Sequence, residues 1–319
     1  MLNQDHCDGV FDEIARLFAM LATPVAELRV YEKIIARTRE CATVSEIFLP
    51  IDVPTAIASA LQLGERVTSQ SAAICTLLWA GADLMDDASD GDGRDDWGIS
   101  DHQLALLYTN LLATLPHLVL TSDDVSEAGR ARCSAAIADA LWNMSHGQFA
   151  DLGCATEVRN CEDSLAVIRQ KTGAEVALFA SIPALLAGSP EQDVAAWRMF
   201  GMQFGSMVQL FTDIRSTFDE SPVSDLLRGK RTLPVMRTLA TLPETSRNCL
   251  ERDLAKLAAG NREPLTRVIE SMHTASAAFS SLMHVELFRY RAAAALPVPL
   301  ENYARTHPLR RLVRSLTVI

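Results

Sequence analysis

The sequence has little of what marks several protein classes. Aromatic residues make up only 6% of its 319 residues, and Val- and Ile-rich runs of strand length are scarce. Ala and Leu dominate instead, which favours an all-α protein. The seven cysteines are odd in number and scattered, without metal-site or redox spacing. We interpret them as reduced thiols, some of which fill core space.

Long apolar runs and basic clusters are also missing. The longest apolar candidate, residues 174–188, contains Glu175 and Pro183 and so falls short of the roughly 18 uninterrupted apolar residues of a membrane span. The N-terminus lacks a charged-then-apolar signal pattern. The net charge is −11, and basic residues gather only at 305–314, where we expect a solvated helix face. We therefore expect a soluble cytoplasmic protein with no nucleic-acid partner and no stable membrane insertion.

Apolar residues recur at helical spacing along nearly the whole chain. The periodicity predicts helices over residues 10–21, 25–35, 54–63, 69–87, 101–120, 126–149, 163–186, 193–218, 233–241, 248–259, 264–279 and 282–295. Gly, Pro, Ser and Asp mark the breaks between them. No break is long enough for a domain linker, so we expect a single domain over residues 1–319, a helical bundle with a cavity between facing helices.

The first of two acidic clusters ends a largely apolar segment. Asp83, Asp86, Asp87 and Asp90 stand at i, i+3, i+4 and i+7, which places them on one face of a helix. Earlier turns of nearly the same face are apolar, as at Leu78. Four neighbouring carboxylates repel one another unless cations neutralise them. The alternative is a solvated acidic helix end.

The second cluster repeats this arrangement. Asp213, Ser216 and Glu220 stand at i, i+3 and i+7, with Gln209 one turn earlier. Carboxylate and hydroxyl oxygens suit Mg²⁺, which commonly shares its coordination shell with substrate phosphate and water. Together the clusters predict a site in which Mg²⁺ bridges a diphosphate and acts as a Lewis acid. The alternative for Glu220 is a helix end beside the following Ser-Pro pair.

Several motifs make the sequence resemble the trans-isoprenyl diphosphate synthases and the related class I terpene synthases. Asp86-Asp87-x-x-Asp90 resembles the family's first aspartate-rich motif. The other matching stretches are G-Q-F-A-D-L at 147–152, K-T-G-A at 171–174 and S-D-L-L-R-G-K-R-T-L-P at 224–234. The resemblance implies an all-α, single-domain isoprenoid synthase bundle around a deep apolar cavity. It also implies a prenyl diphosphate substrate, Mg²⁺ as cofactor (three ions with diphosphate bound) and a homodimer.

The departures from the prenyl synthases concern the second substrate, isopentenyl diphosphate. The family's basic G-K-R-x-R-P motif corresponds to residues 45–50, where only the proline remains. The Arg-Arg pair that follows the first aspartate motif corresponds to residues 93–97, which contain one Arg and two acids. Acids cannot hold a second diphosphate without bridging cations. We therefore expect chain elongation to be lost.

The second acidic cluster is similar to the terpene-synthase signature N/D-D-x-x-S/T-x-x-x-E, with Thr212 at its first position. This resemblance implies a terpene synthase that ionises a C15 or C20 allylic diphosphate and cyclises the cation. Three alternatives stay open: a prenyltransferase that uses a peptide or indole acceptor, a residual prenyl diphosphate synthase, and a catalytically silent subunit.

The remaining site residues fall into two groups. The expected diphosphate clamp consists of Lys171, Lys230, Arg169, Arg215, Arg289, Tyr290 and Gln148. The expected cavity lining consists of Trp79, Gly81, Ala82, Phe149, Phe179, Phe204 and Gln209, and each aromatic residue is equally compatible with a core position. The residues five and four before the first aspartate are small, which in this family leaves the cavity open and favours C15 or C20 over C10.

Overall fold

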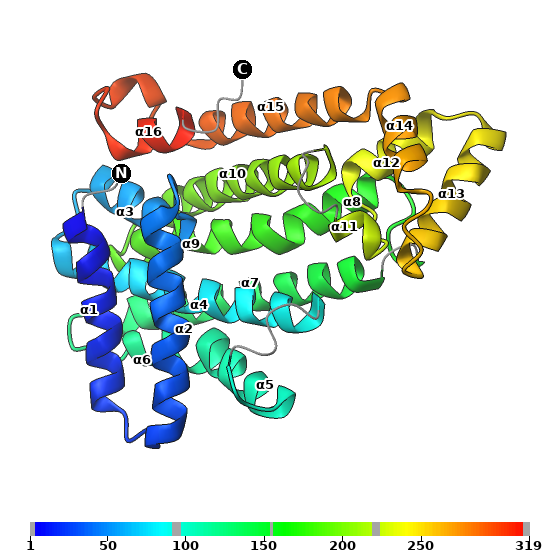
Figure 1. Ribbon diagram of the computed structural model, residues 1–319. Coiled ribbons are helices and arrows are strands. Elements are labelled where there is room, and N and C mark those ends of the chain that lie inside the picture. The colour runs from blue at the N-terminus through cyan, green and yellow to red at the C-terminus, as the bar shows by residue number, and fades with distance from the viewer. Residues whose placement is uncertain (1–3, 91–96, 154–155, 219–223, 315–319) are drawn as a thin grey trace. The chain divides into compact units, whose positions relative to one another are not determined.

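The computed structural model describes residues 4–90, 97–153, 156–218 and 224–314, and every regular element in those ranges is a helix (Figure 1). The all-α prediction is thereby confirmed. The chain divides into two compact units. Unit 1 comprises Met1–Asp139, Leu178–Arg198 and Pro297–Ile319, and unit 2 comprises Ala140–Ala177 and Met199–Leu296.

Long helices pass from one unit into the other. They are α7 (Glu127–Gly153), α9 (Ala174–Leu186) and α10 (Glu191–Phe218). Three of the four chain crossings between the units therefore fall inside helices, and the fourth lies between Leu296 and Pro297. The expectation of a single domain stays a prediction. Among the described residues no single helix is long and apolar enough to cross a bilayer. One bent pair, residues 25–44 with 49–60, passes that test jointly on length and composition.

Unit 1 is built around α4 (Glu65–Asp90). The elements that complete it are α1 (Gln4–Met20), α2 (Val25–Val44), α3 (Leu49–Ala60), α5 (Asp101–Thr109), the π-helical turn η1 (Asn110–Thr114), α6 (Leu115–Val119), the 3-10 turn η4 (Leu300–Asn302) and α16 (Pro308–Arg314). Helix α4 packs against α1, α2, α3, α5, η1 and α6. Its middle is fully buried from Ala72 to Leu78, whereas Asp86 and Asp87 near its end are half-buried. The predicted change from core to carboxylates along one helix is therefore present.

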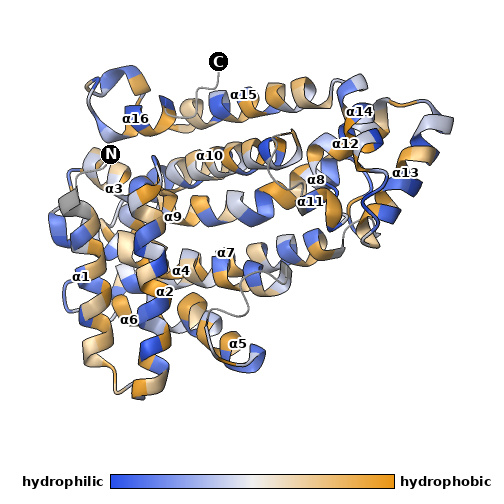
Figure 2. Ribbon diagram, viewed as in Figure 1, coloured by the Kyte–Doolittle hydropathy of each residue, from blue (hydrophilic) through white to orange (hydrophobic). Residues whose placement is uncertain are grey.

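Unit 2 is organised around α12 (Leu233–Thr241), which packs against α8, α13, α14 and α15. The bounds of its other elements are α8 (Cys161–Ile168), the π-helical turn η3 (Arg169–Gly173), α11 (Ser224–Leu227), α13 (Glu244–Ala258), α14 (Leu265–Thr274) and α15 (Ala277–Ala295). One core cluster of this unit is mainly aliphatic, with Leu226, Val235, Leu257 and Val268 almost completely buried. Hydrophilic and hydrophobic positions both occur around the long helices (Figure 2), as expected for helices that bury one face.

Local chemistry explains where the helices begin and end. Helix α5 starts with a capping box between Ser100 and Gln103. Helix α3 starts five residues before the predicted position, because the Phe48 backbone N–H donates to the Asp52 carboxylate at 2.6 Å and caps it. The break between α14 and α15 lies at Ser276, whose φ is +51°, several residues before the predicted break. Helix α12 has the predicted bounds, whereas α11 was not predicted.

Candidate active site

The first acidic cluster occupies the last turns of α4 in unit 1. Asp83 and Asp87 retain 33% and 25% of their side-chain exposure. Burial, with the neighbouring Asp87 carboxylate, raises the pKa of Asp83 to about 6, and Arg37 only partly opposes the rise. The positive charge of Arg37 therefore does not offset the burial of the Asp83 carboxylate. Asp90 lies in the same helix, but its side chain is outside the described residues.

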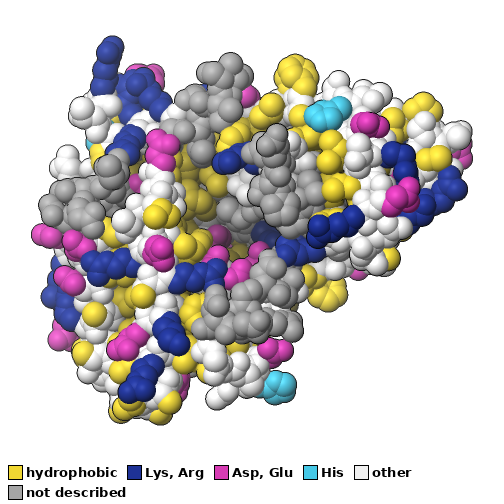
Figure 3. Space-filling view, viewed as in Figure 1, with side chains coloured by type: hydrophobic (Ala, Val, Ile, Leu, Met, Phe, Trp, Pro, Cys, Tyr) yellow, Lys and Arg dark blue, Asp and Glu magenta, His cyan; other side chains and the backbone are white. Residues whose placement is uncertain are grey.

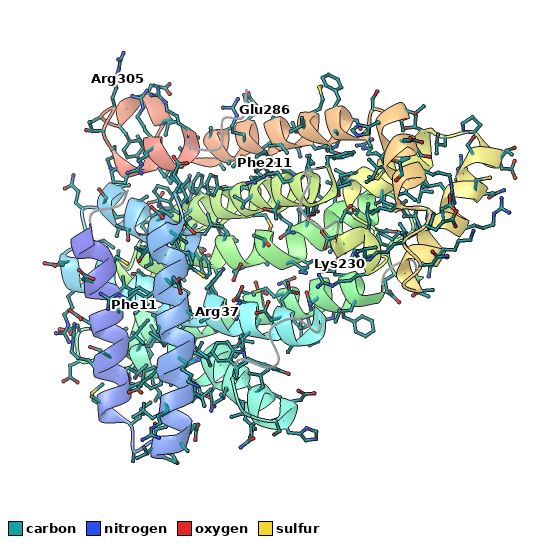
Figure 4. The ribbon with its side chains drawn as sticks, viewed as in Figure 1. Phe11, Arg37, Phe211, Lys230, Glu286 and Arg305 are labelled. Carbon is teal, nitrogen blue, oxygen red and sulfur yellow. The ribbon has the colours of Figure 1, made fainter. Side chains whose placement is uncertain are left out.

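Helix α2 supplies an arginine to this cluster that the sequence motifs did not suggest. The Arg37 guanidinium donates to Asp87 at 2.7 Å and to Asp83 at 3.4 Å. It also lies over the Trp97 ring, 5.7 Å from the ring centre. Figure 4 labels Arg37 on α2, and Figure 3 shows basic and acidic side chains side by side where α2 passes α4. The arginine is 46 and 50 residues away from its partners in sequence, so no short motif contains the pair.

Two lysines of unit 2 meet at one aspartate. Asp151, near the end of α7, accepts from Lys171 at 2.7 Å and lies 3.4 Å from the Lys230 ammonium, which is labelled in Figure 4. Burial alone would raise the pKa of Asp151, but the two ammonium groups outweigh burial and lower it. Lys230 also lies 3.8 Å from Asp225. The structure thus brings together the two lysines predicted for the clamp, around an aspartate whose role sequence reasoning missed.

Close backbone contacts explain two of the sequence motifs. Lys171 lies in the π-helical turn η3 and has a non-helical ψ of −108°. A Cβ atom on Gly147 would come within 2.8 Å of Gln170 and 2.9 Å of the Lys171 side chain. On the other side, a Cβ on Gly205 would meet the Thr172 carbonyl oxygen at 2.4 Å. The glycine of G-Q-x-x-D-L therefore lets α7 approach the turn that presents Lys171.

The second acidic cluster begins with a buried aspartate on α10. Asp213 is 7% exposed and accepts from the Gln209 amide at 2.7 Å, while Gln209 accepts from Thr172 at 2.5 Å. Burial raises the pKa of Asp213 to about 7 against the Gln209 hydrogen bond, and Asp225 and Asp151 add to the rise. Gln209 was predicted to line the cavity. The structure shows it positioning a carboxylate.

Asp225 is a further functional candidate that sequence reasoning missed. The Ser216 hydroxyl donates to the Asp225 carboxylate at 2.9 Å, which connects the predicted metal-ligand serine to the S-D-L-L stretch. The sequence quoted that stretch only as part of a match, without a role for its aspartate. Glu220, the predicted third member of this cluster, lies outside the described residues.

The other predicted clamp residues occupy varied positions. Arg169 pairs with Glu162 at 2.9 Å, and Arg289 pairs with Glu286 one helical turn earlier. Tyr290 is 71% exposed. Arg215 is exposed on α10 and Gln148 is buried on α7. Their part in a diphosphate clamp stays a prediction.

Two predictions about the cavity lining are wrong. Phe149 does not pack into the interior, because its side chain is 72% exposed on α7. Gly81 does not open a space either: a Cβ there would meet Leu112 at 2.8 Å and Leu111 at 3.0 Å. Its lack of a side chain serves the close packing of α4 on η1. Sequence shows that a residue is small but not which neighbour fills the space.

The other predicted lining residues are compatible with the core. Phe179 and Phe204 are fully buried, and Phe204 stacks on Phe200 with 5.6 Å between ring centres. Trp79 packs edge-on against Phe48 at 4.8 Å. Ala82 is half-buried. The role of these residues beside a substrate stays a prediction.

The donor chemistry of both clusters fits Mg²⁺. Within the described ranges no three His, Cys, Asp or Glu side chains are arranged to hold an ion by themselves. Mg²⁺, however, usually takes one or two carboxylates and completes its shell with water and substrate phosphate. Asp213, buried with a carboxyl pKa near 7, is a group whose charged form a cation would stabilise.

A model of the polyprenyl synthetase family matches residues 82–275, which is more than half of the chain. The chain belongs to this family. The predicted membership of the trans-isoprenyl diphosphate synthase superfamily is confirmed.

Curated relatives cover part of the chain. It is 34% identical to a (2E,6E)-farnesyl diphosphate synthase of Mycobacterium tuberculosis over 152 residues, 45% of this chain and 42% of that protein. It is 29% identical to a geranylgeranyl pyrophosphate synthase of Geoglobus acetivorans over 155 residues, 44% of this chain and 48% of that protein. The matched region is therefore less than half the length of either relative.

Solved structures match over nearly the full length. The geranylgeranyl pyrophosphate synthetase of Geoglobus acetivorans aligns with a TM-score of 0.74 and 22% identity, covering 97% of this chain and 94% of that one. That of Pyrococcus horikoshii aligns with a TM-score of 0.71 and 18% identity, covering 98% of each chain. These similarities show the isoprenoid synthase fold.

Proposed function

We propose that this chain is a Mg²⁺-dependent terpene synthase, which ionises an allylic prenyl diphosphate of C15 or C20 and lets the cation react with its own double bonds. The observation that carries the proposal is the side-chain cluster of unit 2. There Lys171 and Lys230 converge on Asp151, while Asp213 and Ser216 present oxygens from α10. Such a set can hold a diphosphate by its charge and by the metal it binds.

The residues of the chain have distinct parts in this chemistry. The lysine ammonium groups bind diphosphate oxygens, and Asp151 holds both lysines in position before substrate arrives. The carboxylates of Asp86 and Asp87, with Asp90, and the oxygens of Asp213 and Ser216, with Glu220, would hold Mg²⁺. When bound, the metal neutralises the leaving diphosphate as a Lewis acid. Stabilising the charge that develops on the leaving group allows the allylic C–O bond to ionise.

Loss of the second substrate site supports cyclisation. Residues 45–50 replace the basic motif of the prenyl synthases and contain no Lys or Arg. The segment is also committed to other interactions, because Phe48 is buried against Trp79 and its N–H is bound by Asp52. A second diphosphate would meet no base from this segment.

Chain elongation is the second candidate, and the names of the relatives favour it. Transfer to a peptide or indole acceptor is a third. Incubation with geranyl, farnesyl and geranylgeranyl diphosphates plus Mg²⁺, with and without radiolabelled isopentenyl diphosphate, distinguishes them by gas chromatography and mass detection. We expect a hydrocarbon or alcohol product from the allylic substrate alone. Efficient incorporation of the label would restore a prenyl synthase, and release of diphosphate only with an added acceptor would indicate transfer.

The outer face of α7 supports the expected homodimer. It carries exposed residues at alternating spacings of three and four, all of them apolar or small. The members of this α7 stripe are Ala128, Ala131, Ala135, Ala138, Trp142, Ser145, Phe149 and Leu152. Such heptad spacing is the pattern by which one helix packs along another, and Trp142 and Phe149 are 67% and 72% exposed. A second copy presents the same stripe, so we propose that α7 pairs with α7.

A double variant, Trp142→Glu with Phe149→Glu, tests this pairing. Size-exclusion chromatography with light scattering should give a dimer for the wild type and a monomer for the variant. Leu106→Glu is the control, because Leu106 is 67% exposed on α5 and lies off the stripe. A wild-type monomer, or a dimer that survives the double variant, would rule out this interface.

A further inference from the structure

Arg37 stands outside every motif of the sequence and yet contacts the first acidic cluster. Its guanidinium is shared between Asp87 and Asp83, at 2.7 and 3.4 Å. These are carboxylates of the same helical face as Asp86. A positive charge from α2 thus already occupies a place beside oxygens to which we assign a metal.

The geometry of Arg37 suits a counter-ion that can be exchanged. Arginine stays protonated at every pH of interest, so its positive charge is permanent. Its side chain is 41% exposed, and ion pairs with that much solvent are weak enough to open. The Trp97 ring, 7% exposed, supports the guanidinium in its present orientation. The ion pair therefore stabilises the acidic cluster but is weak enough to open.

We propose that Arg37 is a built-in counter-ion of the first acidic cluster, which pairs with Asp87 and Asp83 while no metal is bound and releases Asp87 when Mg²⁺ binds. Arg37 is then a positioning residue that lowers the affinity for Mg²⁺ and stabilises the metal-free protein. This inference rests on the proposed function only in that the cluster takes a divalent cation.

The chain offers a matched control on the same helix. Arg39 lies two residues further along α2, pairs with Asp8 and stacks over the Phe11 ring at 5.3 Å. It makes the same kinds of interaction as Arg37, but with a carboxylate of α1. Arg39→Gln therefore removes an equivalent ion pair and leaves the acidic cluster unchanged.

Calorimetric titration with Mg²⁺ alone, and then with Mg²⁺ plus inorganic diphosphate, tests the proposal on wild type, Arg37→Gln, Arg37→Lys and Arg39→Gln. We expect Arg37→Gln to bind Mg²⁺ about two- to fivefold more tightly, the change expected when a partly exposed competing ion pair is lost. Arg37→Lys should lie between this variant and the wild type, and Arg39→Gln should match the wild type. Weaker binding by Arg37→Gln would overturn the proposal and make Arg37 a ligand of the diphosphate. Unchanged binding would also overturn it.

The Mg²⁺ dependence of thermal unfolding and of fluorescence gives readouts that a merely structural arginine would not change. Arg37→Gln should melt about 2 °C below wild type in EDTA, as expected for a loss near 1 kcal/mol in a chain of this size, and should regain the difference in Mg²⁺. A deficit that persists in Mg²⁺ would contradict the proposal. Mg²⁺ should change wild-type tryptophan emission as Arg37 leaves Trp97, and Trp97→Phe should abolish that change. A wild type that binds Mg²⁺ no better than Asp87→Asn would instead sink the proposed function, so the two failures can be told apart.

Discussion

The acidic cluster of unit 1 and the lysine cluster of unit 2 differ in how positive charge acts on a buried aspartate. In unit 1 the Arg37 guanidinium faces the Asp83 and Asp87 carboxylates, yet the pKa of Asp83 is raised to about 6. In unit 2 two ammonium groups face Asp151, whose pKa is lowered. Burial determines the direction of the pKa shift at Asp83, whereas the two ammonium groups determine it at Asp151. Under the proposed function, the carboxylates of the unit 1 cluster would bind metal and the lysines of the unit 2 cluster would bind diphosphate oxygens.

Removing a carboxylate from the unit 1 cluster should have the largest effect. Asp86→Asn or Asp87→Asn is expected to lower diphosphate release by about a thousandfold, because a metal ligand that stabilises the leaving group is worth several kcal/mol. Release of inorganic diphosphate measures this, with circular dichroism as the check on folding. Turnover retained by both variants would remove the metal assignment from unit 1.

Removing a lysine from the unit 2 cluster should cost less, about a hundredfold, as for loss of one positioned donor to a developing anion. We expect this of Lys230→Gln. Because the change removes one of the two lysines that face the buried Asp151, the double variant with Asp151→Asn separates catalysis from folding. Lys256→Gln is the control, since its side chain is 52% exposed and pairs only loosely, at 3.9 Å, with Asp253. Equal activity of Lys230→Gln and Lys256→Gln would mean that unit 2 does not contact the diphosphate.

Much of this comparison was accessible from sequence. Helical periodicity predicted most elements, because each buries one face, and the apolar start of the α4 stripe marked its carboxylates as unusual. The pairing of Arg37 with Asp87 was not accessible, because it joins α2 to α4 across 50 residues. Asp151 stood inside a quoted motif, but only the fold shows that two lysines converge on it. Phe149 was misplaced because its position beside a motif does not show which way its side chain faces, and only the structure shows that it is 72% exposed.

Removing the Ser216 hydroxyl from the second acidic cluster should have a moderate effect on the Mg²⁺ dependence of activity. Ser216→Ala is expected to raise the Mg²⁺ concentration for half-maximal activity several-fold, because a hydroxyl contributes less than a carboxylate. Glu220→Gln should raise it further, since it removes a full charge. The Mg²⁺ dependence of kcat measures both. The reverse order would transfer the second ligand role from Glu220 to the Ser216–Asp225 pair, which the 2.9 Å hydrogen bond already connects.

The smallest expected effect is on the pH dependence of the melting temperature without metal. It compares Asp213, which we expect to need a metal cation, with Asp151, which lysines already face. The folded-state pKa of Asp213 is raised to about 7, whereas an unfolded aspartate titrates near about 3.9. The folded protein therefore binds this proton more tightly, so its stability is greatest below the unfolded pKa and declines as pH rises through about 7.

In EDTA the melting temperature should fall by about 2 °C or more between pH 5.5 and pH 8, as for a change of about 1 kcal/mol. Asp213→Asn should flatten the decline, and Mg²⁺ with inorganic diphosphate should oppose it in the wild type, because the cation then stabilises the charged carboxylate. A decline of the same size in Asp213→Asn would show that the charged Asp213 carboxylate does not destabilise the metal-free protein. The predicted difference between Asp213 and Asp151 would then be wrong.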